Sequence, residues 1–146
     1  MANVEMAFGS YYFSTPAVTT IAAQDTPIKA SGTTTALQVN NFTHSGSNRL
    51  TYTGTTTLYF QITGLFSATK AAGTGADIRF IIAKNGSVVT GMSVTRNVSS
   101  SVEGAMACGG ILQLETDDYI ELWVENQDNA DNMTVQEGSV SAITVG

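Results

Sequence analysis

The sequence predicts an all-β protein, an antiparallel β-sandwich of the jelly-roll or Greek-key type, formed by a single domain. Apolar and polar residues alternate with a period of two along many segments, and helical periodicity is nearly absent. Only 12% of the residues are charged, and Thr, Ser, Gly and Asn are abundant, a composition typical of strands and turns. A chain of 146 residues suits one domain, residues 1–146, and about nine or ten short strands suit a sandwich.

The segment 119–125 shows the clearest alternation. Its even-numbered positions are aliphatic and are expected in the core, whereas its odd-numbered positions hold Tyr119, Trp123 and two glutamates. An aromatic side chain of this size costs ~1.5–3 kcal/mol when it stays exposed to water. We therefore expect this outer face to be covered, either by a subunit interface or by a neighbouring loop of the same chain.

The segments 78–82 and 88–94 predict a β-hairpin. Asn85-Gly86 lies between them and accepts the positive φ angles that a tight hairpin turn requires. On the returning strand we expect one side to be formed by Val88, Thr90, Met92 and Val94.

Further strands are expected between turn-rich stretches. Leu58–Phe66 directs Leu58, Phe60, Ile62 and Phe66 to one face. The remaining predicted strands are Phe8–Phe13, Pro27–Ala30, Ala36–Phe42, Arg49–Thr53, Glu103–Leu114 and Thr134–Val145.

The acidic balance excludes some partners. A net charge of −6 and a pI near 4.4 argue against nucleic acid, because phosphate binding needs clustered Lys and Arg. Residues 101–146 hold nine of the 12 acidic residues and no Lys or Arg. If the two parts of the chain lie on different faces, the molecule has a polar axis. Alternatively, the acids only keep a Thr/Ser-rich surface soluble.

The residues that carry site chemistry are scarce. One cysteine and one histidine exclude a disulfide framework and a Cys/His zinc site. Cys108 alternates with apolar residues and is predicted to be a buried thiol, and His44 is predicted in a surface loop. Neither a nucleophile motif nor paired carboxylates appear, so we expect no enzyme activity, no catalytic residue, no cofactor and no small-molecule substrate.

The acidic loop 126–132 is the one plausible metal site. Read as a helix-loop-helix calcium motif that starts at Asp128, it has Met133 where glycine is required and Ser139 where glutamate is required. We therefore predict no metal site, although a calcium site outside this motif stays open.

The first residues lack a basic region followed by an apolar run, and no stretch of ~18 apolar residues occurs. We expect a chain made in a cytoplasm, without a membrane partner, that stays there or leaves inside a larger particle. Residues 1–6 precede the first predicted strand, and their apolar side chains predict an N-terminal docking arm: Met1, Val4 and Met6. Alternatively, this arm folds back on its own trimer.

The order of several short motifs resembles C1q/TNF-like jelly-roll domains over residues 7–145. The C-terminal Ala142–Gly146 departs from the Phe-Ser-Gly-Phe-like strand of C1q domains, and residues 1–6 contain no collagenous Gly-x-y repeat. The motifs are Ala7-Phe8, Asn41-Phe-Thr43, Leu58-Tyr-Phe60, Lys84-Asn85-Gly86 and the run from Leu114 to Val124.

Jelly rolls that are rich in Thr and Ser and poor in cysteine are similar to those of tailed bacteriophages. This resemblance implies a non-enzymatic, homotrimeric capsid decoration (cement) protein, synthesised in the host cytoplasm and bound to the phage major capsid protein on the virion surface. It implies a trimer interface through Tyr59, Tyr119 and Trp123, and docking through the arm. The alternative is the receptor-binding head of a tail fibre or spike, which normally has an attachment region upstream of its first strand.

Overall fold

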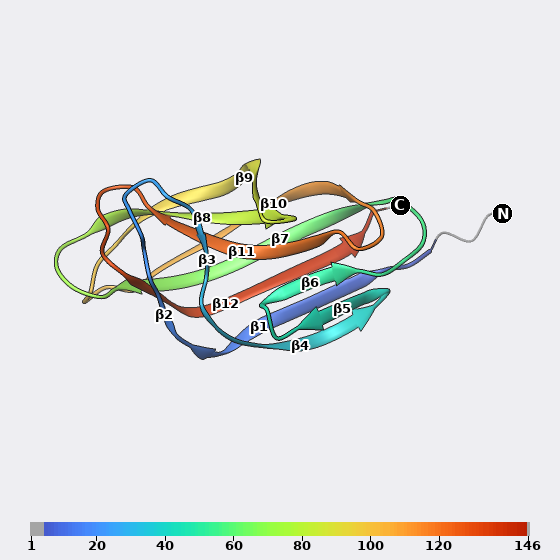
Figure 1. Cartoon of the computed structure of the whole chain (residues 1–146), viewed down its shortest axis with the longest axis horizontal. Helices are drawn as coiled ribbons and strands as arrows, with labels where there is room; N and C mark the ends of the chain where they lie inside the picture. Colours follow the sequence, from blue (N-terminus) through green and yellow to red (C-terminus); the bar gives the residue numbers. More distant parts are fainter. Residues whose placement is uncertain (1–4, 146) are drawn as a thin grey trace.

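The computed structural model describes residues 5–145, and within them it contains twelve strands and no helix. The strands form two six-stranded antiparallel sheets that face each other (Figure 1). The first sheet has the order β10 (Gly104–Leu114), β7 (Leu58–Lys70), β12 (Met133–Thr144), β1 (Phe8–Pro16) and β4 (Gly32–Asn40), with β2 (Val18–Thr19) beside β12. The second has the order β5 (Phe42–Ser45), β6 (Arg49–Tyr52), β11 (Tyr119–Asn126), β8 (Ala76–Lys84) and β9 (Ser87–Val98), with β3 (Ile28–Lys29) beside β11.

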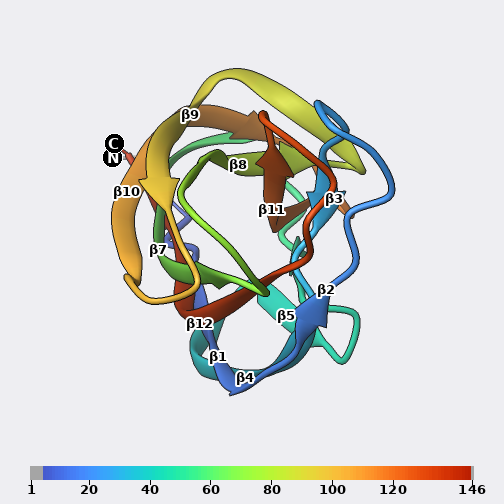
Figure 2. The ribbon, with the colours of Figure 1, turned by 90° about the vertical axis from the view of Figure 1, so that its left-hand side faces the viewer.

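This arrangement confirms the predicted jelly-roll sandwich. Figure 2 looks along the long axis and shows the two sheets as curved layers around one core. The first and last long strands pair directly, with Phe8 opposite Ile143, so the start of β1 and the end of β12 lie at the same end of the molecule. We call this the terminal end and the opposite one the distal end.

The core fills the space between the sheets. Inward positions of β8 and β11 are fully buried, as their alternation predicts. At one end, the rings of Phe42, Tyr52 and Phe60 pack with centroid separations of 5.0–5.3 Å. These tilted and edge-on contacts are the geometry that aromatic rings prefer, and they join β5 and β6 of the second sheet to β7 of the first.

β7 sets the register of the first sheet. It pairs along its length with β10 on one side and with β12 on the other. Phe60, Ile62 and Phe66 point into the core, as predicted. Gly64 shares this inward face, where a Cβ atom would lie 2.8 Å from Ile82 Cδ1. A side chain at this position would therefore push the sheets apart.

The predicted hairpin is present, but one of its side-chain assignments is wrong. Asn85 and Gly86 adopt φ angles of 52° and 75°, as a two-residue turn requires. Gly91, at φ 86°, lies where the register between β8 and β9 shifts. The irregularity reverses the alternation, so Val89 rather than Val88 packs against the core with Met92 and Val94.

The predicted strand Ala36–Phe42 is also wrong as a single element. Asn41 adopts a φ of 55° and separates β4 from β5. The break transfers the chain from the first sheet to the second, because β4 pairs with β1 whereas β5 pairs with β6. Asn tolerates this left-handed conformation better than most residues, so the polar Asn40-Asn41 pair was the available signal.

Replacing Phe60 with alanine is expected to lower the free energy of unfolding by about 3–5 kcal/mol, because it removes a fully buried ring from the aromatic cluster and leaves a cavity. Urea denaturation at fixed protein concentration measures the change. Thr90→Ala, at an exposed position of β9, is the control and should change stability by less than about 0.5 kcal/mol. Equal effects of the two substitutions would contradict this placement of the core.

Candidate functional site

The outer face of the second sheet carries a network of charged side chains around Glu121, which is 2% exposed. Its Oε2 lies 3.2 Å from Lys29 Nζ and 3.5 Å from the Arg49 guanidinium, and its Oε1 accepts a hydrogen bond from Trp123 Nε1 at 3.3 Å. The Arg49 guanidinium also stacks over the ring of Tyr119 at 3.6 Å. Side chains of the same chain therefore contact both aromatic residues of this face.

Other ion pairs also join the basic first part of the chain to the acidic last part. Arg79 on β8 pairs with Glu125 on β11 at 3.3 Å. Lys84 pairs with Asp118 at 2.8 Å. Burial alone would raise the pKa of Asp118, but hydrogen bonds from Glu115 N, Lys84 and Asn85, together with the Lys84 charge, hold this pKa below its usual value. Acids and bases thus alternate on neighbouring strands, so the molecule has no simple polar axis between its two sequence halves.

The outer face of the first sheet is almost free of charge. Its five long strands contain two charged residues, Lys70 and Glu137, and the Lys70 side chain is buried and paired with Asp131 at 2.9 Å. Glu137 is thus the one exposed charge on these strands, and Glu103, in the loop before β10, adds a second carboxylate that accepts a hydrogen bond from Ser67. We call this surface the uncharged face, because its strands expose no other charged side chain. Large apolar side chains are exposed along this face, from β1, β7, β10 and β12: Tyr12, Tyr59, Leu65, Ile111 and Ile143.

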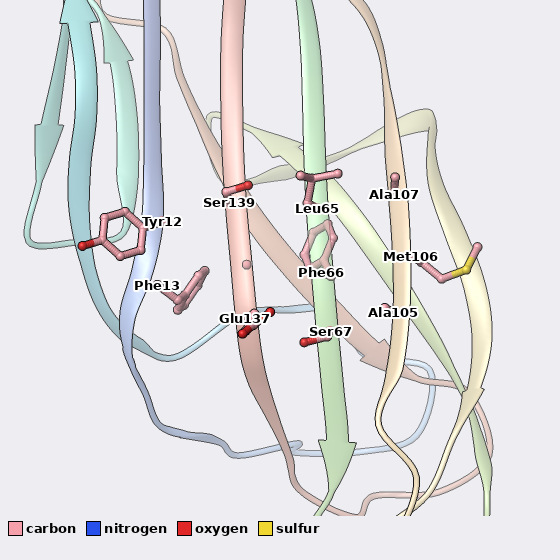
Figure 3. Close-up of a pocket in the computed structure, with 11 residues that line it drawn as sticks. Tyr12, Phe13, Leu65, Phe66, Ser67, Ala105, Met106, Ala107, Glu137 and Ser139 are labelled. Atoms are coloured by element: carbon pink, nitrogen blue, oxygen red, sulfur yellow. The ribbon is translucent and has the colours of Figure 1, made fainter.

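A groove of about 740 Å³ crosses the middle of this uncharged face. It spans β1, β12, β7 and β10, whose lining side chains lie side by side in Figure 3. Apolar groups dominate the lining, with Tyr12 at one side and Leu65 and Ala107 towards the other, and Glu137 contributes a carboxylate. The face combines a hollow with exposed apolar groups, which is typical of an interaction surface.

The structure divides the residues predicted for the trimer interface between the two sheets. Tyr59 lies on the uncharged face of the first sheet and is 56% exposed. Tyr119 and Trp123 lie on the outer face of the second sheet, half-buried within the Glu121 network. The three therefore do not form one continuous surface. The sequence feature that indicates the face with Tyr59 is the near-absence of charged residues in the segments that form β1, β4, β7, β10 and β12.

The predicted docking arm is described only in part. Met1 and Val4 lie outside the described residues. Met6 is 63% exposed, and its backbone carbonyl accepts a hydrogen bond from the Asn40 amide at 2.6 Å. The side chain of Met6 is thus available at the terminal end, and its docking role stays a prediction.

His44 lies on β5 and is partly buried, which corrects its assignment to a surface loop. Its Nε2 lies 2.6 Å from Thr34 Oγ1, which donates to Asn48 Oδ1 at 2.9 Å, and its ring lies 5.2 Å from that of Tyr11. Burial lowers the pKa of His44. The cluster ties β4 to β5 and to the β5–β6 turn, and it includes no carboxylate to orient the histidine as a catalytic base.

Cys108 is buried in the core, as predicted, and burial raises its pKa to about 11. Within residues 5–145 there is no group of three or more His, Cys, Asp or Glu residues that could hold a metal ion. In the acidic loop, Asp128 Oδ2 accepts a hydrogen bond from Asp77 N at 2.8 Å, and Asn126 bonds to Asn129. Among the described residues no helix is long and apolar enough to span a membrane.

No protein-family model and no curated protein matches this sequence. Solved structures do match its fold. Murine APRIL superposes with a TM-score of 0.66 at 7% identity, covering 97% of this chain and 100% of that chain. The PRD1 vertex protein P5 gives 0.61 at 14% identity, covering 96% and 97%. The globular domain of zebrafish complement 1qA gives 0.59 at 11% identity, covering 96% and 98%. These similarities establish the TNF/C1q-like jelly-roll fold.

Treatment with EDTA is expected to leave the melting temperature unchanged, because hydrogen bonds within the chain already hold the acidic loop. Differential scanning fluorimetry with and without EDTA measures this. A specifically bound ion stabilises the folded state by mass action, so a fall of several degrees, reversed by added Ca²⁺, would show that the loop holds a metal.

Proposed function

We propose that this chain is a non-enzymatic structural protein of a tailed-phage virion, a homotrimer that decorates the capsid as a cement protein. The observation that carries the proposal is the uncharged, grooved outer face of the first sheet. The fold is shared with the PRD1 vertex protein P5, a virion component by its name. The partners are two further copies of the chain and the phage major capsid protein, and the location is the capsid surface after synthesis in the host cytoplasm.

The uncharged face is suited to contact between copies of this chain. With a net charge of −6, copies repel one another unless the surfaces in contact are nearly neutral. Leu65, Ile111 and Ile143 are each more than half exposed. Burying these side chains in an interface therefore adds hydrophobic stabilisation that the folded monomer lacks. A closed ring covers this face in every copy.

The charged face of the second sheet is suited to remain in water. Lys29 and Arg49 are about one-third exposed while they pair with Glu121, and covering them would remove their remaining hydration without a new partner. We therefore assign the trimer contact to the face that carries Tyr59, and Tyr119 and Trp123 to the outer surface of the trimer.

Replacing Leu65 with glutamate is expected to dissociate the trimer, because it places a charge in the centre of the covered face at a cost on the order of 3 kcal/mol or more. Light scattering should give roughly three times 15.3 kDa for the native chain and a monomer for the variant at micromolar concentration. Thr43→Glu adds the same charge to the second sheet, at an exposed position of β5, and should remain trimeric, as should Trp123→Ala. A native monomer, or dissociation by Trp123→Ala alone, would contradict the assignment.

Binding to shells tests the cement role. The purified protein should bind saturably to expanded capsids of the phage that encodes it, and not to host cells, as measured by co-sedimentation. Binding to cells without binding to shells would instead indicate a fibre or spike head.

Deletion of residues 2–6 should leave the trimer nearly intact and abolish shell binding, because it removes the predicted docking arm with Val4 and Met6. Full decoration by the shortened chain would show that the anchor lies elsewhere, with the basic residues Lys29 and Arg49 as the next candidates.

A further inference from the structure

We propose that Arg96 of one copy forms an ion pair with Glu137 of the next copy across the trimer interface, and that this pair determines which edge of the sandwich enters the groove. The inference rests on the proposed trimer and extends it. It follows from the charges that the folded chain leaves unpaired, their level along the strands and the surfaces they occupy.

Arg96 is the basic side chain without a carboxylate partner in the described chain. Of the six Lys and Arg residues, the other five form ion pairs within the chain: Lys29, Arg49, Lys70, Arg79 and Lys84. Arg96 is exposed on β9, and its one polar side-chain contact is between Nη1 and the Met106 sulfur at 3.9 Å. Arginine at a protein interface commonly supplies a directed, charge-assisted contact.

Glu137 is the matching unpaired acid. It lies in the groove of the uncharged face and has no ion-pair or hydrogen-bond partner among the described residues. Neighbouring Ser67 donates a hydrogen bond to Glu103, so two carboxylates lie close to the groove. Covering this face with another copy would bury Glu137, and a buried charge without a partner is strongly destabilising. A trimer that uses this face therefore requires a cation here.

Arg96 and Glu137 lie at nearly the same level along the strands. Arg96 Nε lies 3.3 Å from the position of a Cβ atom at Gly104. Gly104 pairs with Ala68, and the next residue, Ala105, pairs with Ser67, which pairs with Glu137. The two charges thus differ by about one residue, or ~3.4 Å, along the strand direction.

The level matters because the exposed apolar residues extend along the strands of the first sheet, from Ile143 near the terminal end to Leu65 in the middle. A neighbour that covers them lies side by side with this copy, with the symmetry axis along the strands. Rotation about such an axis does not change the position of a residue along the axis. Residues that meet across the interface therefore have equal positions along the strand direction. Arg96 and Glu137 meet this condition.

The charges also distinguish the two edges of the sandwich. A threefold ring needs two different surfaces on each copy, one for each neighbour. The first surface is the uncharged face. The edge formed by β4 and β5 carries no charged residue, whereas the edge formed by β9 and β10 carries Arg96. Charge complementarity with Glu137 therefore selects the β9–β10 edge as the second surface.

Charge reversal tests the pair. Each trimer contains three copies of it, so Arg96→Glu or Glu137→Arg alone should raise the trimer dissociation constant at least tenfold, measured by sedimentation equilibrium. The double variant R96E/E137R restores the opposite charges and should recover most of the native affinity. Glu115→Arg, an exposed acid outside this face, is the control for net charge and should leave the trimer unchanged. Circular dichroism shows that each variant is folded.

Should a reversed variant not fold, the milder Arg96→Gln and Glu137→Gln variants replace it, and each should weaken the trimer several-fold. If the native chain is trimeric and none of these variants changes its dissociation constant, the proposed ion pair is wrong, whereas the proposed trimer is supported. If a variant has a lower melting temperature but forms a trimer of native affinity, the two residues contribute to the stability of a single chain. This result would also contradict an ion pair between copies. If both single variants weaken the trimer and R96E/E137R does not recover its affinity, Arg96 and Glu137 do not contact each other directly. A native monomer overturns the trimer and the pair together.

Discussion

The pairing register of β7 with β10 and β12 is the constraint on which the rest of the structure depends. Side chains alternate between the faces of a strand, so a shift by one residue would place Phe60 and Ile62 in water and Tyr59 and Gln61 in the core. With the observed register, the buried side chains meet the second sheet and the outward ones form a surface almost without charge. Core and interaction surface are therefore two results of one pairing pattern.

The two outer faces differ in the number of charged side chains that their strands contribute. Lys29, Arg49 and Glu121 come from three separate segments that the second sheet brings together, and their mutual pairing stabilises charges that β11 partly buries. The first sheet has almost no charged residues to pair. Its surface offers apolar side chains, hydroxyl groups and a groove, which together favour a protein partner of low charge over water or nucleic acid.

The proposed assembly gives both faces a role within a virion. Trimer formation through the first sheet would leave the charged second sheets outside, where ion pairs and a net negative charge maintain solubility. It would also bring three terminal ends together, and with them three exposed Met6 side chains. Three weak attachments joined in one rigid body bind far more tightly than one, which suits a protein that fastens neighbouring subunits of a shell.

The sequence by itself determined the fold class, the Asn85-Gly86 hairpin, the core rows of β7, β8 and β11, and the buried Cys108, because each depends on alternation or turn chemistry within a few residues. Only the tertiary structure decided that Asn41 separates two strands, that His44 joins a buried network, and that Tyr59 lies on a different face from Trp123. These depend on which strands become neighbours, and local periodicity gives no information about pairings between residues far apart in the chain. The lone charge of Arg96 likewise became visible only once the folded chain had paired the other five basic residues.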